Sequence, residues 1–290
     1  MFKLKKINLI YLLGAGRSGT TLMATILNAH KQVQTIGEMH QFIDHINQNK
    51  ECSCGESLNT CVFWSSIVRK LKVLNDDLPQ KQSQFEQKEA HKNIVQLILE
   101  KKEDEEYVSF NEQVFSEIKE QVKTEWFLDS SKYIARYLLL EKSENINIKG
   151  IYIVRDVRGV INSFGKQVQT PKKPLATIIY YLAINFFGQI VFALDRKILK
   201  VKYEDFVEKP EQCLNKIYGH VFGTMDSVNN ISALPEFYEM PHIIGGNRIK
   251  ASKKISIRKD EKWKENISRI KQIKYYLLVF PLMLFNKYKI

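Results

Sequence analysis

A glycine-rich stretch near the N-terminus, GAGRSGTT over residues 14–21, has the composition of a phosphate-binding loop. It follows an apolar run and precedes the helix-like TLMATILNAH, so we expect the loop's backbone N–H groups and the helix N-terminus to converge on one phosphate. Gly14 and Gly19 keep the spacing of the ATP-binding pattern G-x-x-x-x-G-K-[ST], but Thr20 replaces its lysine and Arg17 supplies the cation. This difference argues against a nucleoside triphosphatase. The polarity of the stretch argues against a turn that serves packing alone.

Short apolar or β-branched runs supply the elements that would position this loop. They lie at residues 7–13, 33–36, 126–128, 150–154 and 198–203, separated by helix-like segments. This alternation predicts an α/β protein with a central parallel sheet of about five strands, covered by helices in a three-layer sandwich. Residues 42–125 are polar and charged with helical spacing, and we interpret them as a helical insertion on one edge of the sheet, within a single domain over residues 1–290.

A second cationic stretch, VRDVRGV, follows the run at residues 150–154. Arg155 ends this predicted strand, where α/β sheets place their ligands, so we expect it to reach a ligand. Asp156 and Arg158 open the next helix, where we expect Asp156 to stabilise the N-terminus and Arg158 to pair with it.

The glycine loop resembles the 5′-phosphosulfate-binding loop of sulfotransferases that use 3′-phosphoadenosine 5′-phosphosulfate (PAPS), in which Arg or Lys occupies the position of Arg17. GIYIVRDVRGVINSF resembles that family's second signature, whose Arg and Ser hold the donor's 3′-phosphate. The resemblance implies a P-loop-like sulfotransferase fold, with PAPS as donor, adenosine 3′,5′-bisphosphate (PAP) as product and no metal requirement. It assigns the 3′-phosphate to Arg155 and Ser163. The loop residues implied to bind the donor are Gly14, Gly16, Arg17, Ser18, Gly19, Thr20 and Thr21.

The same resemblance implies the catalytic residues. LDSSK is similar to an Asp-Ser-Ser-Lys segment of the bacterial, carbohydrate and tyrosyl-protein branches, which places Lys132 near the transferring group beside Arg17. Glu38 follows the second predicted strand, at a distance from the loop that matches the catalytic glutamate of the tyrosyl-protein and several bacterial sulfotransferases, so it is the expected base. His40 is the alternative base, because the cytosolic small-molecule branch uses histidine.

Further matches occur in order from residue 12 to about residue 264. VKYEDF resembles the family's Tyr-Glu-Asp-Leu stretch, and HIIGGNRIK with the later DEKW resembles its His…Gly-Asn-x-x-Arg and tryptophan-containing tail. Lys250 stands where arginine is more usual. CSCGESLNTCVFW resembles a cysteine-containing feature of bacterial relatives.

Three cysteines are close together in that last stretch. A zinc site normally needs four ligands, and no CxxC pair accompanies Cys52, Cys54 and Cys61, so His45 or His40 would have to complete the set. We favour a locally packed or optionally disulfide-bonded loop. The sequence analysis therefore assigns no metal ligand.

The net charge of +12 predicts an anionic partner, and the basic residues lack the aromatic interleaving of a nucleic-acid site. The run at residues 7–13 leads straight into the glycine turn without a cleavage pattern, which predicts a strand and a cytoplasmic protein. We interpret residues 174–194 as a buried helix, and residues 275–285 as core packing or contact with a membrane surface. The acceptor is a small molecule or a glycan or lipid.

The sequence leaves three candidate functions to compare. A PAPS-dependent sulfotransferase explains both phosphate signatures. A P-loop kinase or triphosphatase requires ATP and magnesium, and a non-catalytic nucleotide-binding module would not need Glu38 or Lys132. The sequence indicates the first, while the oligomeric state is not readable.

Overall fold

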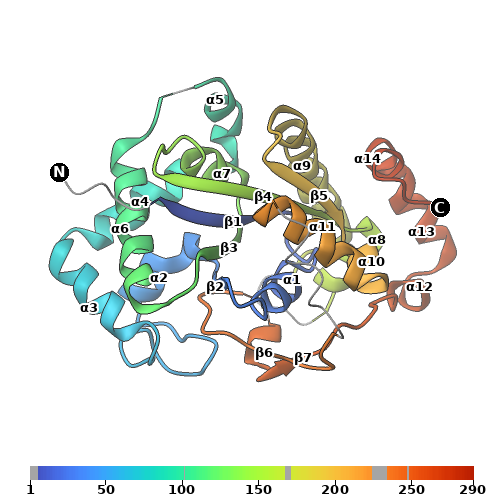
Figure 1. The fold of residues 1–290 in the computed structure, drawn as a ribbon. Coiled ribbons are helices and arrows are strands. Elements are labelled where there is room, and N and C mark those ends of the chain that lie inside the picture. The colour runs from blue at the N-terminus through green and yellow to red at the C-terminus, as the bar shows by residue number, and fades with distance from the viewer. Residues whose placement is uncertain (1–5, 101, 167–170, 224–233, 247) are drawn as a thin grey trace. The chain divides into compact units, whose positions relative to one another are not determined.

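The computed structural model describes residues 6–100, 102–166, 171–223, 234–246 and 248–290. Among these residues, five strands form one parallel sheet flanked by helices, in the order β2-β3-β1-β4-β5 (Figure 1). The strands are β1 (Ile7–Gly14), β2 (Val33–Gly37), β3 (Trp126–Lys132), β4 (Ile146–Val154) and β5 (Ile198–Lys202). Each coincides with a predicted strand, so the α/β fold with a central parallel sheet is confirmed.

The chain divides into two compact units. Unit 1 comprises Met1–Leu13, Thr21–Gly150 and Phe237–Ile255, and unit 2 comprises Gly14–Thr20, Ile151–Glu236 and Ser256–Ile290. The glycine loop therefore belongs to unit 2, although it follows β1 directly in the chain. The single domain expected from the sequence stays a prediction.

Helices of unit 1 fill the expected insertion. Unit 1 contains α1 (Thr20–Leu27, from Thr21), η1 (Met39–Gln41), α2 (Phe42–Asn47), α3 (Ser65–Leu74), α4 (Leu78–Lys88), η2 (His91–Asn93), α5 (Ile94–Leu99), α6 (Glu105–Gln121), α7 (Ile134–Leu140), η4 (Arg248–Ala251) and the antiparallel pair β6 (Tyr238–Glu239) and β7 (Lys254–Ile255). The helical spacing read from the sequence is visible in α5, which buries Ile94 and Leu97. The insertion thus consists mainly of the helices α2 to α6, with an irregular segment over residues 48–64 between α2 and α3.

Strand β3 pairs in parallel with β1 on one side and with β2 on the other. Tyr11 pairs with Asp129 and Leu13 with Lys132, so β3 has one more residue than β1 between these pairs. An extra residue of this kind is a β-bulge, which turns the strand and re-aims the side chain that follows it. The apolar run in the sequence predicts that this strand ends at Leu128. In the structure Asp129, Ser130 and Ser131 are all buried.

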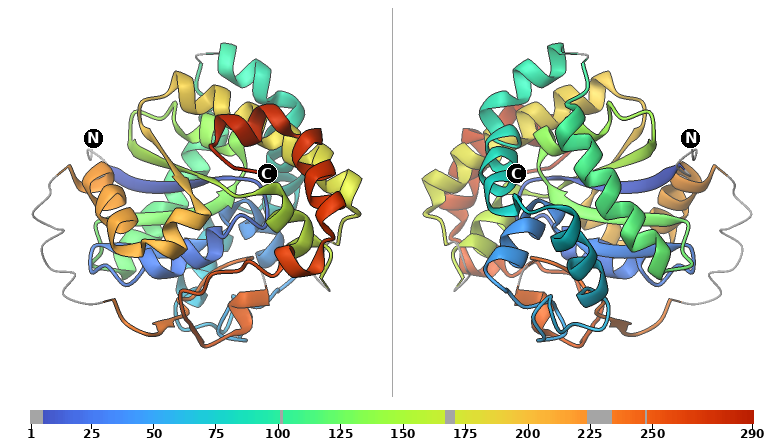
Figure 2. Two further views of the ribbon diagram at one scale, coloured as in Figure 1. Left: turned by 90° about the vertical axis from the view of Figure 1, so that its right-hand side faces the viewer. Right: turned by 90° about the vertical axis from the view of Figure 1, so that its left-hand side faces the viewer.

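Unit 2 carries the helices α8 (Val157–Phe164), α9 (Pro174–Leu194), α10 (Tyr203–Glu208), α11 (Pro210–Phe222), α12 (Trp263–Asn266), α13 (Arg269–Leu278) and α14 (Phe280–Phe285). The C-terminal helices pack within this unit, α13 against α8 and α14 against α9 (Figure 2). Among the described helices, α9 is long and apolar enough to cross a membrane by length and composition. It buries Ile178, Tyr181 and Ile184 but exposes Ile179 and Phe186, so the helix predicted as buried is buried on one face.

Candidate active site

The glycine loop of unit 2 is shaped by close backbone approaches. Gly14 and Gly19 have φ values of 144° and 92°, in the region that favours glycine. A Cβ on Gly14 would lie 2.4 Å from the Ile153 carbonyl oxygen, and one on Gly19 would lie 2.4 Å from the Tyr203 ring. The glycines read from the sequence are therefore required by sterics as well as by conformation. The N–H of Gly16 donates to the Tyr180 hydroxyl at 2.7 Å.

Three predicted donor-binding residues lie together in unit 2. Arg17 Nε donates to Ser163 Oγ at 2.9 Å, and Arg155 Nη1 donates to the Arg17 carbonyl oxygen at 2.9 Å. Arg17 has a φ of 71°, a conformation that a residue with a side chain rarely adopts and that is concentrated at functional sites. The structure thus assembles, from positions about 140 residues apart, the cations and hydroxyl that the sequence assigned to one ligand.

Arg155 is buried and has further partners that sequence reasoning missed. Its guanidinium lies 4.2 Å above the Tyr203 ring and 3.2 Å from a carboxylate oxygen of Asp260. Burial would raise the pKa of Asp260, but Arg155 and Lys166 outweigh it and lower that pKa below its usual value. Asp260 therefore stays ionised and balances the cations beside the loop. It lies in the DEKW stretch, whose contact with Arg155, 105 residues earlier, has no local signal in the sequence.

The hydroxyl residues of the loop are buried: Ser18 is 1% exposed, Thr20 4% and Thr21 7%. Within the described part of the chain, Ser18 Oγ has no hydrogen-bond partner. A buried hydroxyl without a partner is costly, so this atom is suited to an oxygen of a bound anion. This orphaned polar atom beside Arg17 shows that the loop fits a phosphate or phosphosulfate group.

Asp156 and Arg158 form the expected pair at the start of α8. Asp156 accepts from the Arg158 backbone N–H at 2.8 Å and from its guanidinium at 2.6 Å. The same guanidinium donates to the Lys289 carbonyl and lies 4.3 Å above the Trp263 ring. Both residues therefore serve the structure of unit 2, as the sequence predicted.

In unit 1, Glu38 and Lys132 meet at the carboxyl ends of β2 and β3. The Lys132 ammonium donates to Glu38 Oε1, and Gln41 Nε2 donates to Glu38 Oε2 at 3.1 Å. The Glu38 backbone N–H donates to the Ile244 carbonyl at 2.8 Å. Lys132 has a φ of 72°, which the bulge in β3 accommodates, and it is paired with Leu13, the residue just before the glycine loop. The expected base and the expected catalytic cation are therefore direct neighbours.

His40, the alternative base, lies beside this pair. Burial, followed by the charge of Lys132, holds the pKa of His40 well below its usual 6.5, so the imidazole is neutral. Its ring packs on Tyr133 with 4.4 Å between centroids, and its backbone N–H donates to Ser131 Oγ. An imidazole that burial and a neighbouring cation keep from being protonated is poorly suited to accept a proton, which favours Glu38.

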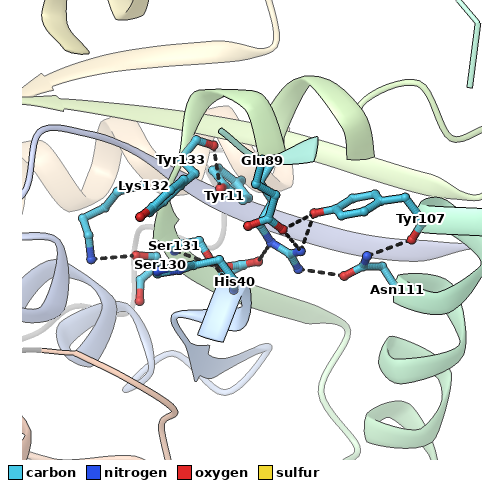
Figure 3. A network of polar contacts seen from close by, with 11 residues as sticks. Tyr11, His40, Glu89, Tyr107, Asn111, Ser130, Ser131, Lys132 and Tyr133 are labelled. Atoms are coloured by element: carbon cyan, nitrogen blue, oxygen red, sulfur yellow. Dashed lines mark hydrogen bonds and ion pairs between the residues drawn. The ribbon is translucent and has the colours of Figure 1, made fainter. Parts of the chain in front are cut away.

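A buried polar network holds the end of β3 in place (Figure 3). Asp129 accepts from the Ser131 N–H at 2.9 Å and from Arg136 Nε at 2.9 Å. The Arg136 guanidinium also donates to Glu89 at 3.0 Å, and to Tyr107 and Asn111. Ser131 is one residue before Lys132, so this network positions the backbone that carries the cation, and the Lys132 ammonium lies 3.4 Å from the Ser130 carbonyl oxygen.

A family model described as the sulfotransferase family matches residues 10–223. The chain belongs to the sulfotransferase family. Sulfuryl transfer is its reaction, and the glycine loop, Arg155 and Glu38 all lie inside the matched residues. No curated protein matches the chain.

Solved sulfotransferases resemble the structure. The sulfotransferase domain from the curacin biosynthetic pathway is 18% identical, with 99% of each chain covered and a TM-score of 0.51. Mouse sulfotransferase SULT7A1, complexed with PAP, is 11% identical over 95% of this chain and 84% of its own, with a TM-score of 0.46. A sulfotransferase from Alicyclobacillus acidocaldarius is 10% identical over 97% and 96%, with a TM-score of 0.43. At these identities, the likeness to the curacin domain supports the fold alone.

In this sulfotransferase, a histidine with a defined tautomer lies behind Glu38, the expected base. His45 Nδ1 is 2.9 Å from the Gln41 carbonyl oxygen, and its Nε2 accepts from the Gly245 N–H at 3.3 Å. Only neutral imidazole with its proton on Nδ1 makes both bonds. Burial lowers the pKa of His45 to about 4. A Cβ on Gly245 would lie 2.9 Å from Glu38 Cβ, so His45 holds a segment that packs against the base. Lys250 follows in η4, while Asn247 lies outside the described residues.

Proposed function

We propose that this sulfotransferase takes its sulfuryl group from PAPS and releases PAP, with no metal in the transfer. The single observation that carries the proposal is the contact of Arg17 with both Ser163 and Arg155. In this proposal the loop amides, Arg17, Thr20 and Thr21 bind the 5′-phosphosulfate. Arg155 and Ser163 bind the 3′-phosphate, because a guanidinium and a hydroxyl are the donors that a phosphate dianion accepts best.

Glu38 is the general base of the proposed reaction. The acceptor hydroxyl attacks sulfur, its proton passes to the Glu38 carboxylate, and the bond from sulfur to the bridging oxygen of the 5′-phosphate breaks. Negative charge grows on that oxygen as PAP leaves. Lys132 stabilises the charge, and Arg17 and the loop amides add fixed positive potential. The contact between Lys132 and Glu38 supports this pairing of roles, because it places the ammonium and the carboxylate side by side at the ends of β3 and β2.

For the acceptor, we propose a hydroxyl on a carbohydrate or a lipid-linked glycan. The insertion supplies Phe42, Phe85 and Phe110 around a cavity of about 20 Å³ beside His40, which is too small for a sugar ring. This cavity therefore does not hold the acceptor. Exposed apolar residues on α9, α13 and α14, among them Phe186, Leu277 and Phe285, support an amphiphilic acceptor or peripheral contact with a membrane.

Calorimetric titration tests the donor assignment. Purified protein is titrated with PAP without metal, and separately with ATP plus magnesium. We expect PAP to bind tightly without metal, and Arg155→Ala to weaken its binding by roughly 10- to 100-fold, the loss of charge-assisted hydrogen bonds. Arg196→Ala is the matched control, since it removes the same charge from an exposed position of unit 2 and should leave the affinity unchanged.

The alternatives give different results in the same experiment. Preference for ATP with magnesium would favour a P-loop kinase or triphosphatase and overturn the donor assignment. Binding of PAP without transfer of labelled sulfate to any of a panel of sugars, glycolipids and phenols would favour a non-catalytic nucleotide-binding module.

A further inference from the structure

Three cysteines and one histidine of unit 1 converge on one point. The ligand atoms of Cys52, Cys54, Cys61 and His242 all lie within 4.8 Å of one another. The sequence analysis favoured a packed or disulfide-bonded loop, with His45 or His40 as the fourth ligand of an alternative zinc site. The structure supplies a different histidine, about 180 residues after the last of these cysteines.

The individual distances match a tetrahedral centre. The Cys54 and Cys61 sulfurs are 3.7 Å apart, and His242 Nδ1 lies 3.3 Å from the Cys61 sulfur and 3.8 Å from the Cys52 sulfur. Bonds of about 2.3 Å to sulfur and about 2.0 Å to nitrogen, at tetrahedral angles, require separations of about 3.8 Å and 3.6 Å. A disulfide requires about 2.05 Å between sulfurs, so the cysteines are not joined in this arrangement.

The surroundings are those of a built site. Backbone N–H groups of Phe63 and Trp64 hydrogen bond to the Cys61 sulfur. The Trp64 indole N–H donates to the His242 carbonyl at 3.1 Å, and the ring of Phe63 stacks on the imidazole. Phe63 and Trp64, the two residues just before α3, therefore hold both the Cys61 sulfur and the His242 imidazole in place.

A short backbone pairing brings the ligands together before any metal binds. Ser53 N–H donates to the Ile243 carbonyl at 3.2 Å, and the Ile243 N–H donates to Ser53 Oγ at 3.0 Å. Ser53, the middle residue of Cys-Ser-Cys, is thus hydrogen-bonded to the residue that follows His242. Gly55, with a φ of 91°, turns the chain tightly after Cys54. The ligands are therefore held by contacts that do not depend on the metal.

We propose that Cys52, Cys54, Cys61 and His242 bind a structural zinc ion. Three thiolates and an imidazole form a closed, four-coordinate set of the kind that zinc prefers, with no position left for a substrate. The ion joins the 52–61 loop to the segment that contains Ile244, whose carbonyl accepts the Glu38 N–H. Zinc binding thereby steadies the backbone of the base without taking part in sulfuryl transfer.

Metal analysis of the full-length protein tests the proposal. Protein purified under reducing conditions without chelator should contain about one zinc ion per chain by plasma mass spectrometry. In Cys54→Ser the zinc should pass to a chromogenic chelator at least about 10- to 100-fold faster than in the wild type. Cys54 is the ligand of choice because its side chain is exposed, so the substitution disturbs packing least. Cys213→Ser, in α11 and outside the cluster, should keep its zinc.

A second measurement keeps the proposal testable where Cys54→Ser fails to fold. Wild-type protein reconstituted with Co²⁺ should show the thiolate-to-cobalt absorption and the intense visible bands of a tetrahedral site, and His242→Cys should retain a metal. Wild-type protein that binds neither Zn²⁺ nor Co²⁺ under reducing conditions would overturn the proposal. So would a Cys54–Cys61 disulfide in place of the metal, found by mass spectrometry of peptides from unreduced protein.

Discussion

The glycine loop of unit 2 and the carboxyl ends of β2 and β3 in unit 1 are organised by different forces. In the loop, shape comes from the backbone: Gly14 and Gly19 occupy conformations and spaces closed to other residues. At the strand ends, shape comes from side chains, because Glu38 and Lys132 depend on each other and on a buried network centred on Arg136.

This difference determines which parts of the sequence are needed to build each region. A backbone-built loop needs only a short, contiguous stretch of sequence. A site built from side chains needs partners from several helices and strands, and only the folded structure brings these partners together. We therefore expect the loop to tolerate loss of a single side-chain contact better than the strand ends do, and the following changes test that expectation.

The largest expected effect follows Arg136→Leu. The substitution leaves the Asp129 and Glu89 carboxylates buried without their shared cation, which should lower the free energy of unfolding by about 3–5 kcal/mol. Urea unfolding measures the loss. Arg136→Lys keeps one charge and should lose less. A loss of less than about 1 kcal/mol in the free energy of unfolding of Arg136→Leu would contradict the view that side-chain contacts hold the ends of β2 and β3 in shape.

Glu38→Gln removes the carboxylate of the proposed base while preserving the shape of the side chain. We expect kcat to fall by about 10³-fold, the usual contribution of a general base, with PAP affinity unchanged. Turnover with labelled PAPS and calorimetry measure the two quantities. Exposed Glu86→Gln is the control and should leave both intact. If His40→Gln abolishes turnover while Glu38→Gln does not, the base is His40.

The stability of unit 1 should depend on pH through His45. Its folded-state pKa of about 4 is below the ordinary 6.5 because of burial, so between these values the unfolded chain binds the proton and the folded chain does not. Stability is therefore full above about pH 6.5 and falls as the pH drops toward 4, by up to about 3 kcal/mol. Unfolding of wild type and His45→Asn across this range measures it. Parallel pH profiles for the two proteins would contradict the assignment.

Tyr180→Phe should have the smallest effect. It removes the hydroxyl that accepts the Gly16 N–H, and one neutral hydrogen bond corresponds to a loss of PAP affinity of roughly 2- to 10-fold. Tyr238→Phe is a matched control, since that hydroxyl has no partner among the described residues. A loss of PAP affinity larger than about 100-fold in Tyr180→Phe would show that a side chain, not the backbone, determines the shape of the loop.

The same contrast explains what the sequence could predict. All five strand positions, the loop glycines and the Asp156–Arg158 pair were readable, because periodicity, turn chemistry and helix capping are local signals. The roles of Glu38 and Lys132 came from resemblance. Their direct contact could not be derived, since they are 94 residues apart and meet only because β2 and β3 are neighbours in the sheet.

The missed residues share a physical cause. Tyr180, Tyr203, Asp260 and His242 act through contacts with distant segments, and none lies in a repeating pattern. The buried Asp129 was also missed as part of a strand, because a polar residue is compatible with a buried strand only when its partner, here Arg136, is known.

The bulge in β3 has a consequence for chain length. Lys132 points at Glu38 because β3 contains one residue more than β1 between two paired positions. Deleting a single residue such as Ser130 would restore even pairing and rotate the lysine to the opposite face of the sheet, although every functional group would still be encoded. At this point the direction of the Lys132 side chain is specified by the number of residues in the strand rather than by their types, so a one-residue deletion should be more damaging than most substitutions nearby.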